Sequence, residues 1–302
     1  MTQRQLTVGT FTPSILIHVA RESNAFERAG LDVRESLVAS SPAQFQSLER
    51  GELDLLFTSP DNVLAYQYLS KNPLGRTIPV RILAAVDRGV GLSLTIGPHL
   101  STVEQVRGNV VGVDVPQSGF AFVAYELLAR CGLEPTSYEL DALGSTPQRA
   151  TALVASRCAA TVLNAGNEIR ARGLGCSTVS EVGVLGPYLG TVIAASPNED
   201  DATNIAHRRF CDIILETARE ILAGERLSEV VNAARQLLEL DETQAREHYA
   251  CLSEHPSGLI GDGRVDVNAL TTLIDLRRTY MPTPELDLIV DSIDGILIGA
   301  AR

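Results

Sequence analysis

The segment LERGELDLLFTSPDN, residues 48–62, decides the fold. Residues with helical periodicity end near Arg50, a short apolar run follows over Leu53–Phe57, and the polar loop Thr58–Asn62 leads into the next helix. A short β-rich run between two helical segments is typical of right-handed βαβ units. The segment therefore predicts an α/β protein with a mainly parallel sheet.

The same alternation continues toward the N-terminus. Apolar runs over residues 6–9 and 31–38 are each followed by helical periodicity, which ends near Ala29 and near Arg50. These runs predict two further strands beside the strand at 53–57.

A second stretch repeats the pattern with strand-like runs at 110–113, 138–143 and 160–163, separated by helical segments. A shift of 105 positions places Ser41-Pro42 on Thr146-Pro147. This internal similarity predicts two α/β lobes with related folds.

Two connections between the lobes follow from the order of these runs. The β-like runs at 80–86 and 91–96 lie on either side of Asp87-Arg88-Gly89 and predict a crossing from the first lobe to the second. Residues 186–195 predict a return crossing. After Ala195 the periodicity is helical only, as in 203–223, which ends at Gly224, a good position for a left-handed cap. We expect these helices to pack back onto the first lobe.

Charge and hydropathy exclude two classes of partner. The chain has 302 residues, with 25 Lys and Arg against 37 Asp and Glu, and a net charge of -12. Such a surface argues against nucleic acid and anionic lipid. No apolar run reaches the roughly 18 to 20 residues that span a bilayer, so we expect no membrane insertion.

Location is predicted from the cysteines and the first residues. An odd number of cysteines inside apolar periodic segments indicates free thiols in a reducing compartment. Residues 1–5 lack a basic stretch followed by an apolar core, so the sequence as it stands predicts a cytoplasmic protein. A chain from which a signal peptide had been removed would instead be periplasmic. The cysteines are Cys131, Cys158, Cys176, Cys211 and Cys251.

Six strand-to-helix junctions are the places to look for a ligand, because ligands of open parallel sheets bind beyond the carboxyl ends of the strands. Hydroxyl and amide side chains dominate them. Each alone is an ordinary helix cap, but six helix N-termini converging from two lobes suit a small anion or a group with acceptor oxygens. The junctions are residues 10–14, 39–42, 58–62, 116–120, 144–147 and 164–167.

The junctions contain no Cys or His, and their ionisable side chains are Asp61 and, slightly further off, Asp114 and Glu168. General acid–base and nucleophilic catalysis need a positioned titratable group. The sequence therefore predicts a site that binds rather than reacts, with no catalytic residue. His18, one turn into the first helix, is a possible ligand contact or base, and the alternative is helix packing or exposure.

Two residues at the crossings complete the candidate site. A cleft-facing Arg88 would bind a carboxylate or sulfonate in a bidentate manner, and the alternative is a solvated loop arginine. Tyr188 would cover one face of the ligand, and the alternative is structural packing.

The sequence predicts no metal and no cofactor. It contains no nucleotide-binding or metalloprotease motif, and Gly173-Leu174-Gly175 follows a helix rather than a strand. His248, Cys251 and His255 have the spacing of one helical face, but Pro256 follows at once and weakens the pattern as a metal site.

Four segments resemble a known family. AFERAGLDV (25–33), LERGELDLLFTSPDN (48–62), VRGNVVGVDVPQSGFAF (106–122) and GLIGDGRVDVNAL (258–270) are similar to the substrate-binding proteins of ABC importers for nitrate, sulfonates, taurine and thiamine-pyrimidine precursors. The yeast-type pyrimidine synthases belong to the same group, but their cysteine-rich motif is missing here.

The resemblance implies a periplasmic-binding-protein type II fold. Residues 1–88 and 190–302 would form one lobe, and residues 89–189 the other. The resemblance also implies that eight residues of this chain bind the ligand. The junctions and crossings add four further candidates, Ser14, His18, Arg88 and Tyr188. The eight are Thr12, Ser41, Thr58, Ser59, Ser118, Gly119, Phe120 and Asn164.

The expected function is binding of a small organic anion or heterocycle between the lobes, as the monomeric substrate-binding component of an importer whose partner is a permease. A cytoplasmic enzyme on the same fold, such as a decarboxylase, desulfinase or dehydratase acting on an aromatic acid, is one alternative. Related desulfinases have a catalytic thiol near the position that Phe11 occupies in this chain. The absence of a thiol there weakens the enzyme alternative. A cytoplasmic ligand sensor is the other alternative.

Overall fold

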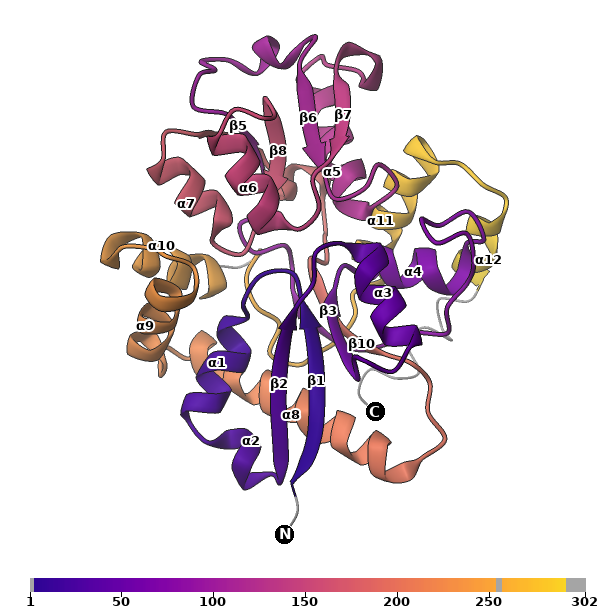
Figure 1. The fold of residues 1–302 in the computed structure, drawn as a ribbon, viewed down its shortest axis with the longest axis vertical. Helices are drawn as coiled ribbons and strands as arrows, with labels where there is room; N and C mark the ends of the chain where they lie inside the picture. The colour runs from indigo at the N-terminus through magenta and orange to yellow at the C-terminus, as the bar shows by residue number, and fades with distance from the viewer. Residues whose placement is uncertain (1–2, 254–256, 292–302) are drawn as a thin grey trace.

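The computed structural model describes residues 3–253 and 257–291, and its strands form two separate five-stranded sheets, one in each lobe (Figure 1). The first sheet has the order β2-β1-β3-β10-β4, and the second has the order β7-β6-β8-β5-β9. The predicted α/β class and the two related lobes are confirmed. The strands are β1 (Arg4–Thr10), β2 (Leu31–Leu37), β3 (Leu55–Thr58), β4 (Arg81–Asp87), β5 (Ser93–Ile96), β6 (Val110–Val113), β7 (Glu139–Ala142), β8 (Ala160–Leu163), β9 (Ser177–Glu181) and β10 (Thr191–Ala195).

Each sheet is mixed because one strand is reversed. In the first sheet β10 is antiparallel to both of its neighbours, β3 and β4, while β1 is parallel to β2 and β3. In the second sheet β5 is antiparallel to β8 and β9. The reversed strand of each sheet directly follows a crossing between the lobes, so the chain enters each sheet from the side of the other lobe.

Hydroxyl and carboxylate side chains begin most of the long helices. The side chain of Ser14 accepts from the backbone N–H of Ile17, and Ser118 caps its helix in the same way through Ala121. The helices of the two lobes are α1 (Ile15–Glu22), α2 (Ala25–Arg28), α3 (Ser41–Glu49), α4 (Pro60–Tyr68), α5 (Gly119–Arg130), α6 (Thr146–Val154) and α7 (Asn167–Gly173), with 3₁₀ turns at Val103–Val106, Pro135–Ser137 and Val182–Leu185.

The first predicted helix is divided in two. Asn24 adopts a left-handed conformation with φ of 56°, which ends α1 and turns the chain into the short α2. Asn is one of the residues that tolerates this conformation.

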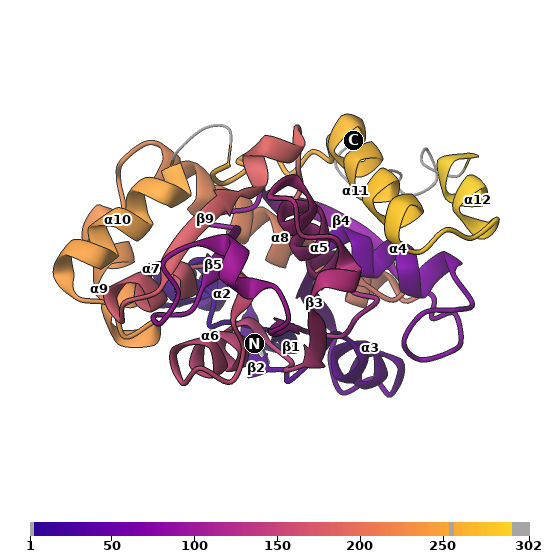
Figure 2. The same ribbon diagram turned by 90° about the horizontal axis from the view of Figure 1, so that it is seen from above.

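The C-terminal helices flank both lobes. They are α8 (Asp201–Leu222), α9 (Leu227–Leu237), α10 (Glu242–Ser253), α11 (Val267–Tyr280) and α12 (Glu285–Asp291). α8 ends just before Gly224, whose φ of 84° agrees with the predicted left-handed cap. Both ribbon views place α10 beside α7 and α11 beside α5, on opposite sides of the molecule (Figures 1 and 2).

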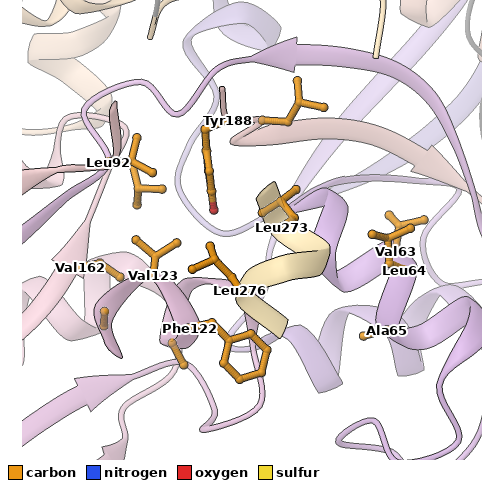
Figure 3. Packing of buried hydrophobic residues seen from close by; sticks show 14 of the residues in the cluster. Val63, Leu64, Ala65, Leu92, Phe122, Val123, Val162, Tyr188, Leu273 and Leu276 are labelled. Carbon is orange, nitrogen blue, oxygen red and sulfur yellow. The ribbon is translucent and has the colours of Figure 1, made fainter. Parts of the chain in front are cut away.

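The largest cluster of buried apolar side chains connects the two lobes through α11. Leu273 and Leu276 of α11 lie between Leu64 of α4 and Val123 of α5 (Figure 3). A second cluster packs α1, α8 and α9 against the other face of the first sheet. No helix within residues 3–253 and 257–291 is both long and apolar enough to cross a bilayer.

Candidate functional site

A cavity of about 140 Å³ lies between the lobes, where strand ends of both sheets meet the crossings. Its volume is close to the roughly 150 Å³ of an engineered apolar cavity that binds benzene. The cavity thus has room for a ligand about the size of one substituted ring. Its lining comprises residues 10–16, 57–59 and 164–165 together with Asn62, Val86, Asp87, Val90, Asp114, Ser118, Phe120, Thr146, Arg149, Gly190, Thr191, His248, Leu252 and Leu259.

Seven of the twelve candidate residues line this cavity. They come from four of the six predicted junctions, and the first, third, fourth and sixth junctions are thereby brought together from both lobes. The seven are Thr12, Ser14, Thr58, Ser59, Ser118, Phe120 and Asn164.

Three candidates at or near the junctions lie outside the lining. His18 is half-buried on α1, two residues beyond the last lining residue of this helix, Leu16, and it lies close to Glu35. Ser41 is buried, and its backbone N–H donates to the Asp114 carboxylate at 3.2 Å. Gly119 faces Asp61, because a Cβ on this glycine would lie 2.6 Å from the Cβ of that residue.

The two candidates at the crossings also lie elsewhere. Nη1 of Arg88 donates to the carbonyl of Leu259 at 3.0 Å, so the side chain ties the first crossing to the segment before α11. Tyr188 is fully enclosed in the large apolar cluster beside Leu92 (Figure 3). The positively charged residue in the lining is Arg149, which is not among the twelve predicted site residues.

Arg149 is 1% exposed and lies on the inner face of α6. Nε donates to Thr161 Oγ1 at 3.2 Å, Nη1 to the carbonyl of Gly144 at 2.6 Å, and Nη2 to Thr146 Oγ1 at 3.1 Å and to the carbonyl of Val162 at 3.2 Å. These acceptors are all uncharged. A guanidinium has five N–H donors, so one donor of Nη1 remains after these four bonds.

Burial lowers the pKa of Arg149 to about 10, which still leaves the guanidinium protonated at neutral pH. A buried cation is normally paired, and here the four bonds end on neutral oxygens. The nearby Asp114 carboxylate acts on it only as a Coulombic influence. The wall of the second lobe therefore presents a protonated guanidinium to the cavity, close to the Asp114 carboxylate of the same lining.

Glu35 fixes the first junction. Its Oε1 accepts from Thr10 Oγ1 and from the backbone N–H of Ser14, both at 2.7 Å. Burial raises the pKa of this carboxyl, although the two hydrogen bonds oppose the rise. Glu35 thereby holds the loop that contributes the lining residues 10–14.

Asp87 fixes the two crossings to each other. Its Oδ1 accepts from the backbone N–H of Gly89 at 2.8 Å and of Val90 at 3.4 Å, and Thr191 hydrogen-bonds to the same carboxyl group. Burial raises the pKa of Asp87. Gly190 passes so close that a Cβ there would lie 2.2 Å from Oδ1. The crossings are thus packed together at the floor of the cavity.

Hydrogen bonds across the mouth hold the lobes together. The backbone N–H of Ser145 donates to the carbonyl of Ala39 at 2.8 Å, and Asn167 Nδ2 donates to Thr12 Oγ1 at 3.2 Å. On the side of the C-terminal helices, Arg172 of α7 pairs with Glu247 of α10 at 2.5 Å. These contacts describe a closed arrangement of the two lobes.

His248 contributes to the lining of the cavity from α10, although its spacing in the sequence suggests only a metal ligand. It is 2% exposed, and its Nδ1 has no hydrogen-bond partner among the described residues. Burial lowers its pKa to about 4, so the ring is neutral at pH 7. Residues 3–253 and 257–291 contain no group of three side chains that could hold a metal, and His255 lies outside them.

No cysteine belongs to the lining of the cavity as far as the structure describes the chain. Cys131, Cys158, Cys176 and Cys211 are free thiols. Burial raises the pKa of Cys158 to about 11 and that of Cys211 to about 12, which makes both thiols poor nucleophiles at neutral pH.

Solved structures share this fold at low sequence identity. The alkanesulfonate-binding protein SsuA from Xanthomonas axonopodis pv. citri, bound to MOPS, is 14% identical, with a TM-score of 0.75 over 97% of this chain and 98% of that chain. The periplasmic nitrate-binding protein NrtA from Synechocystis PCC 6803 is 14% identical, with a TM-score of 0.74 over 97% of this chain and 86% of that chain. A DszB mutant in complex with biphenyl-2-sulfinic acid is 12% identical, with a TM-score of 0.61 over 96% of this chain and 99% of that chain. No protein-family model and no curated protein matches the sequence.

Proposed function

We propose that this protein binds a small organic anion between its lobes and acts as the substrate-binding component of an ABC importer. The observation that carries the proposal is the buried guanidinium of Arg149, which faces the interlobe cavity while its hydrogen bonds end on uncharged oxygens. The shared fold with sulfonate-binding and nitrate-binding proteins supports the same class of ligand.

The remaining lining suits an anion attached to an apolar body. Ser118 and Thr146 lie at the starts of α5 and α6, where free N–H groups and the positive end of the helix dipole favour an acceptor oxygen. Phe11, Phe57 and Leu252 supply apolar surface on the side of the first lobe and α10. Sulfonates and carboxylates are therefore the preferred ligands of this proposal, and an uncharged pyrimidine is the weaker one.

The proposal includes the organisation of the chain. Residues 1–88 and 190–302 form one lobe and residues 89–189 the other, with the crossings fixed by Asp87 between them. The protein works as a monomer, delivers its ligand to a permease, and is located on the outer side of the membrane. The sedimentation mass of the purified protein tests the monomer, and neighbouring genes for a permease and an ATPase would favour import over sensing.

A thermal-unfolding screen tests the binding function. The probes are nitrate, methanesulfonate, benzenesulfonate and benzoate, with benzyl alcohol and benzylamine as neutral and cationic controls. A ligand at a hundred times its dissociation constant adds about 2.7 kcal/mol to the free energy of unfolding. We expect at least one anion to stabilise the protein and neither control to do so. Stabilisation by none of the anions would contradict the proposal, and consumption of a stabilising anion would favour the enzyme alternative.

A further inference from the structure

The inner face of α10 supplies one polar residue to the cavity. Ala245, His248 and Leu252 are the buried residues of this helix, and their spacing of three and four places them on one face. His248 and Leu252 both belong to the lining of the cavity. The imidazole is thus directed into the ligand site from outside both sheets.

The surroundings of His248 leave its Nδ1 without a hydrogen-bond partner among the described residues. The ring lies against Gly166 at the start of α7, because a Cβ on that glycine would be 3.5 Å from Nδ1. Leu238 of the preceding segment packs against the same glycine. The neighbouring Glu247 is paired with Arg172, and the Glu168 carboxylate accepts from the backbone N–H of Gly166 through Oε2. No described residue supplies a partner for Nδ1.

A neutral imidazole has one N–H donor and one acceptor nitrogen. A hydroxyl group can satisfy either nitrogen, since it both donates and accepts. The volume of about 140 Å³ and the presence of Phe11, Phe57 and Phe120 in the lining suit an aromatic ring, which stacks favourably on phenylalanine. Arg149 of the second lobe and His248 of α10 both belong to this lining, so one small ligand can contact both.

We propose that His248 is a specificity-determining residue that selects aromatic anions bearing a hydroxyl group. The inference rests on the proposed function, because it assumes that an anionic group binds beside Arg149. The hydroxyl occupies the unused hydrogen-bonding position of His248, and the ring fills the apolar space between them. An unsubstituted ring leaves the imidazole without a partner and binds more weakly.

Calorimetry at pH 7 with matched probes tests the inference. The probes are benzenesulfonate, 3-hydroxybenzenesulfonate and 4-hydroxybenzenesulfonate, which share one anionic group and one ring. A site built around a buried hydrogen-bonding group discriminates against an analogue that leaves the group unpaired, so we expect one hydroxylated probe to bind at least about tenfold more tightly than benzenesulfonate.

His248→Leu is expected to bring the ratio of the two affinities close to one, because the hydrogen bond that distinguishes the hydroxylated probe from benzenesulfonate is removed. His248→Gln keeps a donor and an acceptor and is expected to retain part of the preference. His207 of α8 is the matched control, since it is also a buried histidine with unpartnered nitrogens but lies outside the lining. His207→Leu is expected to retain the full preference.

The outcomes separate the two proposals. Binding of benzenesulfonate with no hydroxyl preference, or a preference that survives in His248→Leu, overturns the role of His248 and leaves the proposed function standing. Binding of none of the three probes overturns the inferred ligand class, and the broader screen with nitrate and methanesulfonate then decides the proposed function. If His248→Leu does not fold, His248→Gln is compared with the wild type instead. An unchanged hydroxyl preference together with an unchanged affinity in His248→Gln counts against the inference.

Discussion

Arg277 forms two hydrogen bonds with the carboxylate of Asp61, from Nε to Oδ1 at 2.9 Å and from Nη2 to Oδ2 at 2.5 Å, and both side chains are 1% exposed. Nη2 also donates to the carbonyl of Gln117 at 3.1 Å, and the guanidinium lies 4.7 Å from the ring centre of Phe122. Arg277 belongs to α11, Asp61 to α4 of the first lobe, and Gln117 and Phe122 to the second lobe. One arginine thus joins α11 to both lobes.

Removing either partner of this ion pair is expected to destabilise the protein strongly. Asp61→Asn or Arg277→Met leaves one buried charge without its partner, which costs about 3–5 kcal/mol. The double variant Asp61→Asn with Arg277→Met is expected to lose less than the sum of the single losses, because no charge of this pair remains buried. Urea unfolding measures the free energies.

The control for this prediction is the exposed pair of Arg107 and Glu104. Both side chains of that pair are half or more exposed, so Arg107→Met is expected to change the unfolding midpoint very little. Equal effects of Arg107→Met and Arg277→Met would contradict the importance assigned to burial.

Gly190 is expected to be intolerant of any side chain. A Cβ at this position would lie 2.2 Å from Asp87 Oδ1 and 2.6 Å from the Cα of Gly89, so Gly190→Ala forces the two crossings apart. Overpacking of this kind costs about 1–3 kcal/mol. Gly183 is the matched control, because a Cβ there meets no atom within 4 Å. We expect Gly183→Ala to leave the thermal midpoint unchanged or slightly higher, and a similar loss in both variants would overturn the prediction.

The junction loops could be predicted because their signals are local. Ser14 and Ser118 act as helix caps within three residues of their own position, and parallel strands then bring the loops together at the same edge of each sheet. The pairing of β10 with β3 and β4 is not local. The run at 191–195 indicates a strand, but its reversed direction depends on the other lobe.

Arg149 and His248 could not be selected from local patterns. Both lie inside helices, where a polar residue usually faces solvent, and only the packing of α6 and α10 against the rest of the molecule directs them inward. Arg88 and Tyr188 differ from Arg149 and His248, because the structure places them outside the lining of the cavity. Both are close to the crossings in sequence, yet Arg88 bonds to the carbonyl of Leu259 and Tyr188 packs in the core. One usable signal for Arg149 is its spacing, since it stands three residues after Thr146 and four before the buried Leu153.

The stability of the protein is expected to fall between about pH 6.5 and pH 8 because of Glu168. Burial raises the pKa of this carboxyl from its ordinary 4.5 to about 8. Between these values the folded state binds more protons than the unfolded state, so stability decreases as the pH rises, by up to about 1.4 kcal/mol per pH unit. Glu168→Gln keeps an acceptor for the N–H of Gly166 but does not titrate, and it is expected to flatten this part of the profile.

His248 acts in the opposite direction at acid pH. Burial lowers its pKa from 6.5 to about 4, so the unfolded state binds more protons in that interval and stability rises with pH. The contributions of Glu168 and His248 to the pH dependence of stability therefore offset each other between about pH 4.5 and 6.5. Urea midpoints from pH 4 to pH 9 measure the profile. A wild-type curve that rises between pH 6.5 and 8, or an identical curve for Glu168→Gln, would be incompatible with the buried neutral carboxyl.

The final prediction assigns the charge of the ligand site to Arg149 rather than to Arg88. Arg149 belongs to the lining of the cavity, whereas Arg88 does not, and its side chain donates to the backbone carbonyl of Leu259. A hydrogen bond to a charged group contributes about 1.5–3 kcal/mol, so Arg149→Gln should weaken the binding of an anion such as benzenesulfonate by about ten- to a hundredfold. Arg149→Lys keeps the positive charge but loses the planar set of N–H donors. Its affinity for the anion should therefore lie between those of the wild type and Arg149→Gln. Arg88→Gln should leave the affinity unchanged. Circular dichroism first shows that each of the three variants is folded, and calorimetry then measures its affinity for the anion. A larger loss of affinity in Arg88→Gln than in Arg149→Gln would place the anion at the crossing.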